Sequence, residues 1–148
     1  MNDDTTLRLE RIIDASPDRV FAAWTTREAM EAWYRDGDGA VARVTELDVR
    51  VGGRYRVEFG PPGEPPFVEV GEFLELDPPR RLVMTETLMS DSQTMWAETK
   101  VTVELHDQNG KTRCVLTHEG FPDRDRRDGA LGGWPGFLDR IELLLSTR

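Results

Sequence analysis

His118 is the residue of this 148-residue chain best suited to acid–base chemistry. Residues 112–119 alternate in a way that predicts a strand with Cys114, Leu116 and His118 on one face. If that face lines a cavity, His118 could hydrogen-bond a ligand or transfer a proton near neutral pH. The alternative is a core histidine satisfied by a backbone carbonyl or a carboxylate. No second catalytic residue stands at a recognisable spacing, so we assign no catalytic residue.

A second polar candidate is Glu86, which shares a strand face with three apolar residues, Leu82, Met84 and Leu88. If that face points inward, the carboxylate needs a partner, because burying an unpaired charge costs several kcal/mol. His118 and Arg140 are the candidate partners. The alternative turns the other face inward, that of Val83, Thr85, Thr87 and Met89, and leaves Glu86 in solvent. The sequence leaves both alternatives open.

Aromatic side chains supply the apolar part of a possible ligand site, because stacking adds to apolar burial. We interpret Trp24 as core, whereas Trp33, Tyr34 and Trp96 stand beside predicted loops, where the mouth of a cavity would lie. With the polar candidates, the predicted ligand-contacting residues are Trp33, Tyr34, Tyr55, Phe59, Glu86, Trp96, His118, Trp134 and Phe137.

The sequence gives little support for a cysteine nucleophile, a zinc site or a phosphate-binding loop. Cys114 and His118 are four positions apart on one strand, roughly 13 Å, which is too far for a nucleophile and its base. Two histidines and one cysteine show no zinc-site spacing. The glycine pairs at 52–53 and 132–133 lack the spacing of a phosphate-binding loop. We therefore expect no metal and no cofactor.

Composition indicates one globular domain over residues 1–148, with residues 1–6 as a disordered tail. A net charge of -9 argues against nucleic acid and anionic membranes as partners. No apolar run approaches the ~18 residues of a membrane span, and the acidic start does not resemble a signal peptide. A lone cysteine forms no intrachain disulfide. We expect a cytoplasmic monomer or homodimer.

Alternating hydrophobicity predicts seven strands, and turns rich in Gly, Pro, Asn and Asp separate those that follow residue 40. Such short links join antiparallel neighbours. The predicted strands are 7–13, 42–47, 54–59, 68–76, 82–88, 97–105 and 112–119. The inner faces of 68–76 and 82–88 cannot be chosen from the pattern, because apolar residues occupy both faces of each.

Helices are predicted at three places. Ser16 and Pro17 form a helix start, and a second start follows at Thr26. Near the end of the chain an apolar stripe at helical spacing comprises Leu131, Trp134, Leu138, Ile141 and Leu145. Pro135 and its neighbouring glycines penalise a straight helix, so we expect a kink or a restart at 132–136.

These elements suggest an α+β helix-grip fold, with a seven-stranded curved antiparallel sheet wrapped around a long C-terminal helix. Two short helices are inserted after the first strand. A sheet closed on one side by a helix can leave an apolar cavity, and such cavities are common ligand sites. It can equally be solid.

Five segments in order cover nearly the whole chain: 15–24 (ASPDRVFAAW), 33–34 (WY), 71–85 (GEFLELDPPRRLVMT), 117–122 (THEGFP) and 133–140 (GWPGFLDR). They resemble the SRPBCC (START-like) superfamily, and within it the branch named for the activator of the heat-shock-protein-90 ATPase. The resemblance implies a cavity between sheet and C-terminal helix. It also implies apolar ligands such as lipids, sterols or polyketides, cyclisation or hydrolysis in some members, and a co-chaperone in the branch's namesake.

Our leading hypothesis is therefore the non-enzymatic binding of a small apolar or amphipathic ligand in that cavity. One alternative is a protein-interaction or stress role, with a chaperone or another protein as partner. A second alternative is a cavity enzyme of the cyclase or hydrolase type that uses His118 with Glu86. The fold signature by itself names no reaction.

Overall fold

The computed structural model of the chain describes residues 4–37, 39–91 and 93–146. The strands are β1 (Thr6–Ile13), β2 (Val41–Leu47), β3 (Arg54–Gly60), β4 (Phe67–Asp77), β5 (Arg81–Ser90), β6 (Gln93–Gln108) and β7 (Lys111–Glu119). The helices are α1 (Pro17–Thr25), α2 (Arg27–Tyr34) and α3 (Arg124–Ser146). Ser16 caps α1 as predicted, since its hydroxyl accepts from the Arg19 N–H at 3.4 Å.

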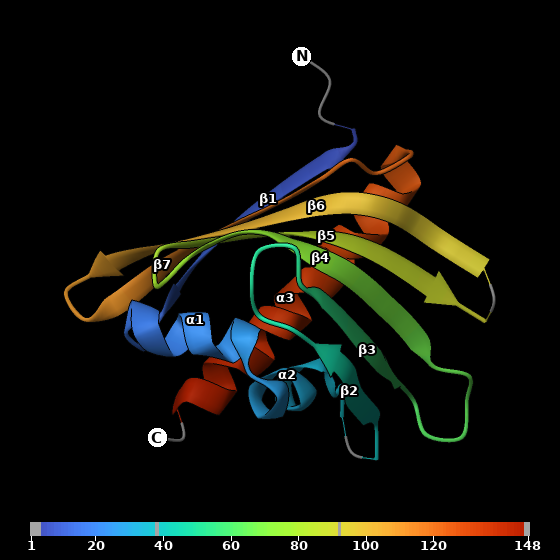
Figure 1. Cartoon of the computed structure of the whole chain (residues 1–148), viewed down its shortest axis with the longest axis horizontal. Coiled ribbons are helices and arrows are strands. Elements are labelled where there is room, and N and C mark those ends of the chain that lie inside the picture. Colours follow the sequence, from blue (N-terminus) through green and yellow to red (C-terminus); the bar gives the residue numbers. More distant parts are fainter. Residues whose placement is uncertain (1–3, 38, 92, 147–148) are drawn as a thin grey trace.

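The strands form one sheet in the order β1-β7-β6-β5-β4-β3-β2, and each neighbouring pair is antiparallel. β1 and β2 lie at opposite edges, so α1 and α2 carry the chain from one edge to the other. Figure 1 shows the curved sheet with α3 running diagonally across it and α1 and α2 on the same side as α3. The α+β helix-grip fold predicted from the sequence is confirmed.

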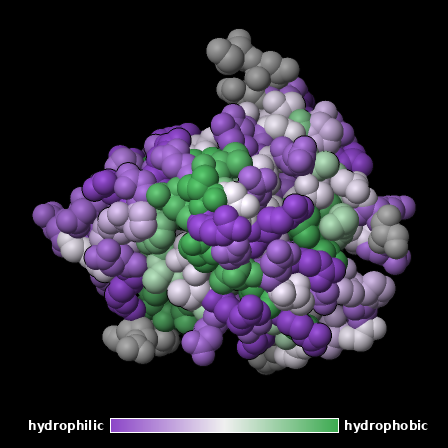
Figure 2. Space-filling model, in the orientation of Figure 1, coloured by the Kyte–Doolittle hydropathy of each residue, from purple (hydrophilic) through white to green (hydrophobic). Residues whose placement is uncertain are grey.

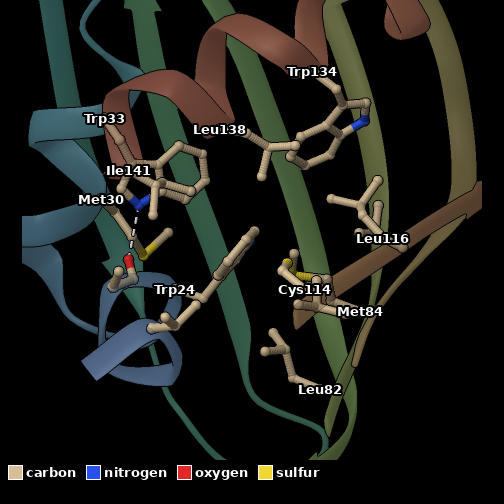
Figure 3. Packing of buried hydrophobic residues seen from close by; sticks show 14 of the residues in the cluster. Trp24, Met30, Trp33, Leu82, Met84, Cys114, Leu116, Trp134, Leu138 and Ile141 are labelled. Atoms are coloured by element: carbon tan, nitrogen blue, oxygen red, sulfur yellow. Dashed lines mark hydrogen bonds between the residues drawn. The ribbon is translucent and has the colours of Figure 1, made fainter. Parts of the chain in front are cut away.

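The core lies where α1, α2 and the C-terminal half of α3 meet the sheet. Trp24, Leu138 and Ile141 are at most 2% exposed and point into the space between helices and strands (Figure 3). Trp33 joins them, and its indole N–H donates to the Ala23 carbonyl at 2.8 Å. These side chains leave little room, so this half of the molecule is solid.

α3 is one continuous helix, so the predicted restart at 132–136 is wrong. Pro135 removes the hydrogen bond that its N–H would have donated to the Leu131 carbonyl. Packing of the flanking helix against the sheet offsets that loss, because tertiary burial supplies most helical stability in proteins. The buried stripe also differs from the prediction by one residue. It comprises Ala130, Trp134, Leu138, Ile141 and Leu145, and Leu131 is 36% exposed.

The structure also decides the two strand faces that the sequence left open. On β5, Glu86 points inward with Leu82 and Met84. On β4, Glu69 and Phe73 point inward, whereas Leu74 is exposed. A register shift between Phe73 and Glu75 reverses the alternation further along β4. That shift turns Leu76 toward the core, although it shares the face of Val70 and Leu74 in the sequence pattern.

The sheet begins close to the start of the chain. The Thr5 carbonyl accepts from the N–H groups of Gly120 and Phe121 at 3.1 and 3.2 Å, and β1 starts at Thr6. Of the expected tail, residues 1–3 lie outside the described residues, whereas Thr5 and Thr6 belong to the hydrogen-bonded structure. Residues 38 and 92, in two of the predicted turns, also lie outside the described residues.

The face of the molecule in Figure 2 is mostly hydrophilic, with smaller hydrophobic patches between. Large apolar side chains that are exposed come from β1, β2, β4, α3 and the β2–β3 turn: Ile12, Val41, Val49, Val51, Leu74, Leu131 and Leu143. Within the described residues, no helix combines the length and apolar character needed to cross a membrane.

Candidate functional site

Four buried polar side chains come from four consecutive strands of the sheet. They are Glu69 on β4, Glu86 on β5, Thr99 on β6 and His118 on β7, and none is more than 6% exposed. The strand register brings them together, because Glu86 pairs with Thr99 and His118 pairs with Val101, two residues beyond Thr99. Residues two apart on a strand share a face, so Thr99 lies between the carboxyl and the imidazole.

A bulge in β6 turns one further donor, Trp96, toward this cluster. Trp96 and Thr99 are three residues apart and would face opposite sides of a regular strand. Between them Glu98 has a φ of +50°, and the register with β5 shifts at the same place. As a result, the Trp96 indole donates to Glu86 Oε1 at 2.9 Å, and the Thr99 hydroxyl donates to the Glu86 carbonyl at 2.8 Å.

The hydrogen bonds of His118 assign its tautomer. The Trp134 indole N–H donates to Nδ1 at 3.1 Å, so Nδ1 is an acceptor and the proton is on Nε2. Nε2 lies 2.7 Å from Thr99 Oγ1 and 3.1 Å from Glu86 Oε1. Burial lowers the pKa of His118 to about 4. The ring is therefore a neutral donor, and the geometry gives little support to His118 as a proton acceptor near neutral pH.

Of the two partners proposed for an inward Glu86, His118 is the one in contact. Arg140 instead donates to the Trp33 carbonyl at 2.8 Å and to Asp36 Oδ1 at 3.2 Å. Glu86 is also next to a second carboxyl, that of Glu69. Sequence reasoning did not identify this carboxyl.

Glu69 and Glu86 form a buried acidic pair. The hydroxyls of Tyr34 and Tyr55 donate to Glu69 Oε2 at 2.9 and 3.0 Å. Burial raises the pKa of Glu69 well above its ordinary value, and repulsion by Glu86 adds to the effect. Burial also raises the pKa of Glu86, although hydrogen bonds from Glu69 and Trp96 act against it. The two carboxyls hydrogen-bond each other, so they share a proton and titrate as a coupled pair.

A cavity of about 170 Å³ lies beside this pair, between the strands and the N-terminal half of α3. Its walls include Glu69, Glu86 and His118. Its apolar lining comprises Phe59, Phe67, Leu88, Trp96, Ala130, Trp134 and Phe137. A dry cavity of roughly 150 Å³ is large enough to bind benzene, so this space accommodates a single aromatic ring.

The cavity continues into a wider groove of about 570 Å³. Phe59, Phe67, Gly133 and Phe137 line both. The groove is bordered by Tyr34, Ala40, Pro61, Pro62 and the ion pair of Arg140 with Asp36. A ligand longer than one ring can therefore extend from the cavity into the groove.

Glycines on α3 keep this space open. A Cβ atom built on Gly129, Gly132 or Gly133 would meet no atom within 4 Å outside the helix itself. Gly129 and Gly133 line the cavity and are exposed to solvent, so the cavity reaches the surface along the helix. The sheet and α3 therefore pack solidly at one end and enclose a hollow at the other.

The predicted site residues are distributed unevenly around this hollow. Phe59, Glu86, Trp96, His118, Trp134 and Phe137 line the cavity. Tyr34 lines the groove, and Tyr55 reaches the site through its hydroxyl on Glu69. Trp33 borders neither space, because it lies in the core, stacked on Tyr34 with ring centroids 4.4 Å apart.

Sequence reasoning missed Glu69, Phe67 and the glycines of α3 as site residues. A signal for Glu69 was present, since it alternates with Phe67 and Phe73 and so shares their face. Val70 and Leu74 on the opposite face are also apolar, so the alternation did not show which face of the strand points inward. The glycines were interpreted only as helix breakers.

The remaining reactive groups lie apart from this site. Cys114 is buried, and burial raises the pKa of its thiol to about 12, as expected of a small core side chain. In the described part of the chain, no three His, Cys, Asp or Glu side chains gather in a way that could hold a metal ion.

Comparison with known proteins agrees with the fold. Residues 14–146 match the family described as Activator of Hsp90 ATPase homolog 1-like protein. A Rhizobium loti protein of known structure is 33% identical, with a TM-score of 0.80, 94% of this chain and 95% of that chain covered. A Chromobacterium violaceum protein is 28% identical, with a TM-score of 0.83 and coverage of 95% and 97%. Curated protein sequences gave no match.

Proposed function

We propose that this chain, which belongs to the family of Activator of Hsp90 ATPase homolog 1-like proteins, holds a small apolar or amphipathic molecule between the sheet and α3. The observation that supports this most is the cavity of about 170 Å³ and its continuation into the groove. A pocket with apolar walls and a few convergent polar groups is typical of a ligand site.

An amphipathic ligand suits the two ends of this space. The deep end carries the hydroxyl, carboxyl and imidazole groups around Glu69 and Glu86, whereas the middle is bounded by Phe59, Trp134 and Phe137. The rings of Trp134 and Phe137 meet edge to face with centroids 5.6 Å apart, which makes a rigid wall. A polar head would lie at the deep end and an apolar body along the aromatic wall and groove.

Thermal unfolding in the presence of candidate ligands tests this proposal. We expect single-ring aromatics, and members of a class such as fatty acids, sterols or aromatic polyketides, to raise the melting temperature. A ligand at about 100 times its Kd adds about 2.7 kcal/mol, or roughly 5–10 °C for a domain of this size. Absence of a shift with every compound would contradict the proposal.

A pair of glycine variants tests where the ligand binds. Gly133→Leu fills the cavity, whereas Gly132→Leu adds the same side chain one residue away, where it borders only the groove. We expect Gly133→Leu to abolish the shift caused by a single-ring ligand and Gly132→Leu to retain it. Equal shifts in both variants would place the ligand elsewhere.

The family also favours a second candidate function, an activator-type interaction with a chaperone of the Hsp90 kind. The test is the ATPase rate of the cognate chaperone with and without this chain. An increase that survives Gly133→Leu would support a surface interaction independent of the cavity. An unchanged rate together with no complex in a pull-down would remove this candidate.

A further inference from the structure

The acidic pair in the cavity wall has no cationic partner. Among the described residues, neither Glu69 nor Glu86 forms an ion pair with an arginine or a lysine. The groups that hydrogen-bond to the two side-chain carboxyls are Tyr34, Tyr55, Trp96 and His118. All four are neutral donors, because the tyrosines and the indole carry no charge and the imidazole is held neutral by burial.

These donors are divided between the carboxyls in a way that leaves the middle of the pair free. The tyrosine hydroxyls meet Glu69 Oε2, and the indole and imidazole meet Glu86 Oε1. The other oxygen of each carboxyl remains for the shared proton. Each proton that the pair loses leaves a buried negative charge without a counterion, which costs several kcal/mol.

In the described part of the chain, the cationic side chains of the neighbouring elements α3 and β6 have partners away from the pair. On α3, Arg140 is bound to Asp36 at the rim of the groove, and Arg126 is paired with Asp123 and donates to the Met95 carbonyl. From β6, the neutral side chains of Trp96 and Thr99 contact Glu86, whereas Lys100 is paired with Glu119. The chain as a whole has a net charge of -9, which further disfavours an anionic ligand.

We propose that the cavity selects a lipophilic amine, whose ammonium group replaces the shared proton between Glu69 and Glu86 while its apolar body lies along Phe59, Trp96 and Phe137. This inference rests on the proposed ligand-binding function and names its ligand class. Charge-assisted hydrogen bonds to two carboxylates and the faces of aromatic rings both favour a cation. The displaced proton leaves to solvent, and no covalent bond of the ligand changes.

Three ligands of one shape test the class. Benzylamine is a cation, benzyl alcohol is neutral and benzoate is an anion, and the ring of each matches the cavity of about 170 Å³. Titration calorimetry should show benzylamine binding at least about tenfold more tightly than benzyl alcohol, with benzoate weakest. Benzylamine affinity should rise with pH as the pair loses its proton, whereas that of benzyl alcohol should not.

The double variant Glu69→Gln with Glu86→Gln removes the charge and retains the shape and acceptor oxygens. It should bind benzylamine and benzyl alcohol with similar affinity. Glu72→Gln is the matched control, since Glu72 is an exposed carboxylate on the same strand, and it should retain the preference. If the double variant does not fold, the pH dependence of the unaltered chain decides.

The outcomes separate the two proposals. Equal affinities for amine and alcohol, or a preference that persists in the double variant, would overturn the amine class and leave ligand binding intact. If none of the three ligands binds and the wider thermal screen also fails, the proposed function falls, and this inference falls with it.

Discussion

His118 has both ring nitrogens engaged by groups that belong to the protein. Nδ1 accepts from Trp134, and Nε2 donates toward Thr99 and Glu86. An indole N–H can only donate, so a second proton cannot enter at Nδ1 unless this contact breaks. The histidine that the sequence marks as the most reactive group therefore serves to hold Glu86 and Trp134 at the cavity wall.

Trp134→Phe tests this assignment because it retains a ring in the wall and removes the indole N–H. We expect the pKa of His118 to rise from about 4 but to stay below its ordinary 6.5, because burial still disfavours the charged form. NMR titration of the imidazole signals measures it. Trp96→Phe is the control, since that indole donates to Glu86 instead. An unchanged pKa in Trp134→Phe would show that the indole does not restrain the ring.

At the scale of elements, glycines on α3 and β4 have opposite roles. The α3 glycines face open space, whereas a Cβ atom on Gly71 would lie 2.0 Å from the Thr85 carbonyl oxygen and 2.6 Å from the Tyr55 ring. Gly71 thus lets the Tyr55 ring lie against β4, from where its hydroxyl reaches Glu69. The helix uses glycine to leave space, and the strand uses it to allow close packing.

This contrast predicts opposite effects of the same substitution. Gly133→Ala should raise the free energy of unfolding by about 0.5–1 kcal/mol, because alanine favours a helix and meets no neighbour. Gly71→Ala should lower it by about 1–3 kcal/mol, because strand and ring must move apart. Urea unfolding measures both. Destabilisation by Gly133→Ala would mean that the space beside α3 is filled.

Continuity of α3 leads to a second prediction at this scale. Pro135→Ala should raise the free energy of unfolding by about 2 kcal/mol, because it restores a hydrogen bond to the Leu131 carbonyl inside the helix. Pro17→Ala is the control. Pro17 stands at the first position of α1, where its missing N–H costs nothing, and its replacement should bring no gain. Equal effects at both positions would contradict a continuous α3.

For the whole molecule, the acidic pair makes stability depend on pH. The pKa values of Glu69 and Glu86 are raised above the ordinary 4.5 in the folded state. The folded state therefore holds more protons than the unfolded one above that pH, and stability falls as pH rises. His118, whose pKa is lowered to about 4, has the opposite effect. Its contribution to the stability of the folded state is lost as pH falls below 6.5.

Comparison with the Glu69→Gln, Glu86→Gln double variant isolates the contribution of the pair. Since both proteins contain His118, we expect the unaltered chain to lose stability relative to the variant as pH rises from 4.5 toward 8. Urea unfolding across this range checks it. Parallel stability curves would show that the carboxyls titrate alike in folded and unfolded chains.

Local periodicity in the sequence was sufficient to predict the strands, the two short helices and their order. Alternation along 54–59 and 97–105, and the Ser16–Pro17 start of α1, depend on neighbours a few residues apart, so a single sequence displays them. The number and order of those elements suggested a helix-grip fold, the resemblance of segments such as 71–85 to a known superfamily implied the same fold, and the family is confirmed.

Only the tertiary structure decided the interior of the site. Glu69 lies in the cavity wall because pairing with β5 turns the face of Phe67, Glu69 and Phe73 inward, and Trp96 and Thr99 both reach Glu86 because β6 bulges at Glu98. The continuity of α3 past Pro135 depends on burial against strands distant in sequence. Bulges and helix packing are settled by sums of long-range contacts, which local spacing does not contain. The sequence by itself therefore determined the elements and their order, and packing determined which carboxyls share the hollow.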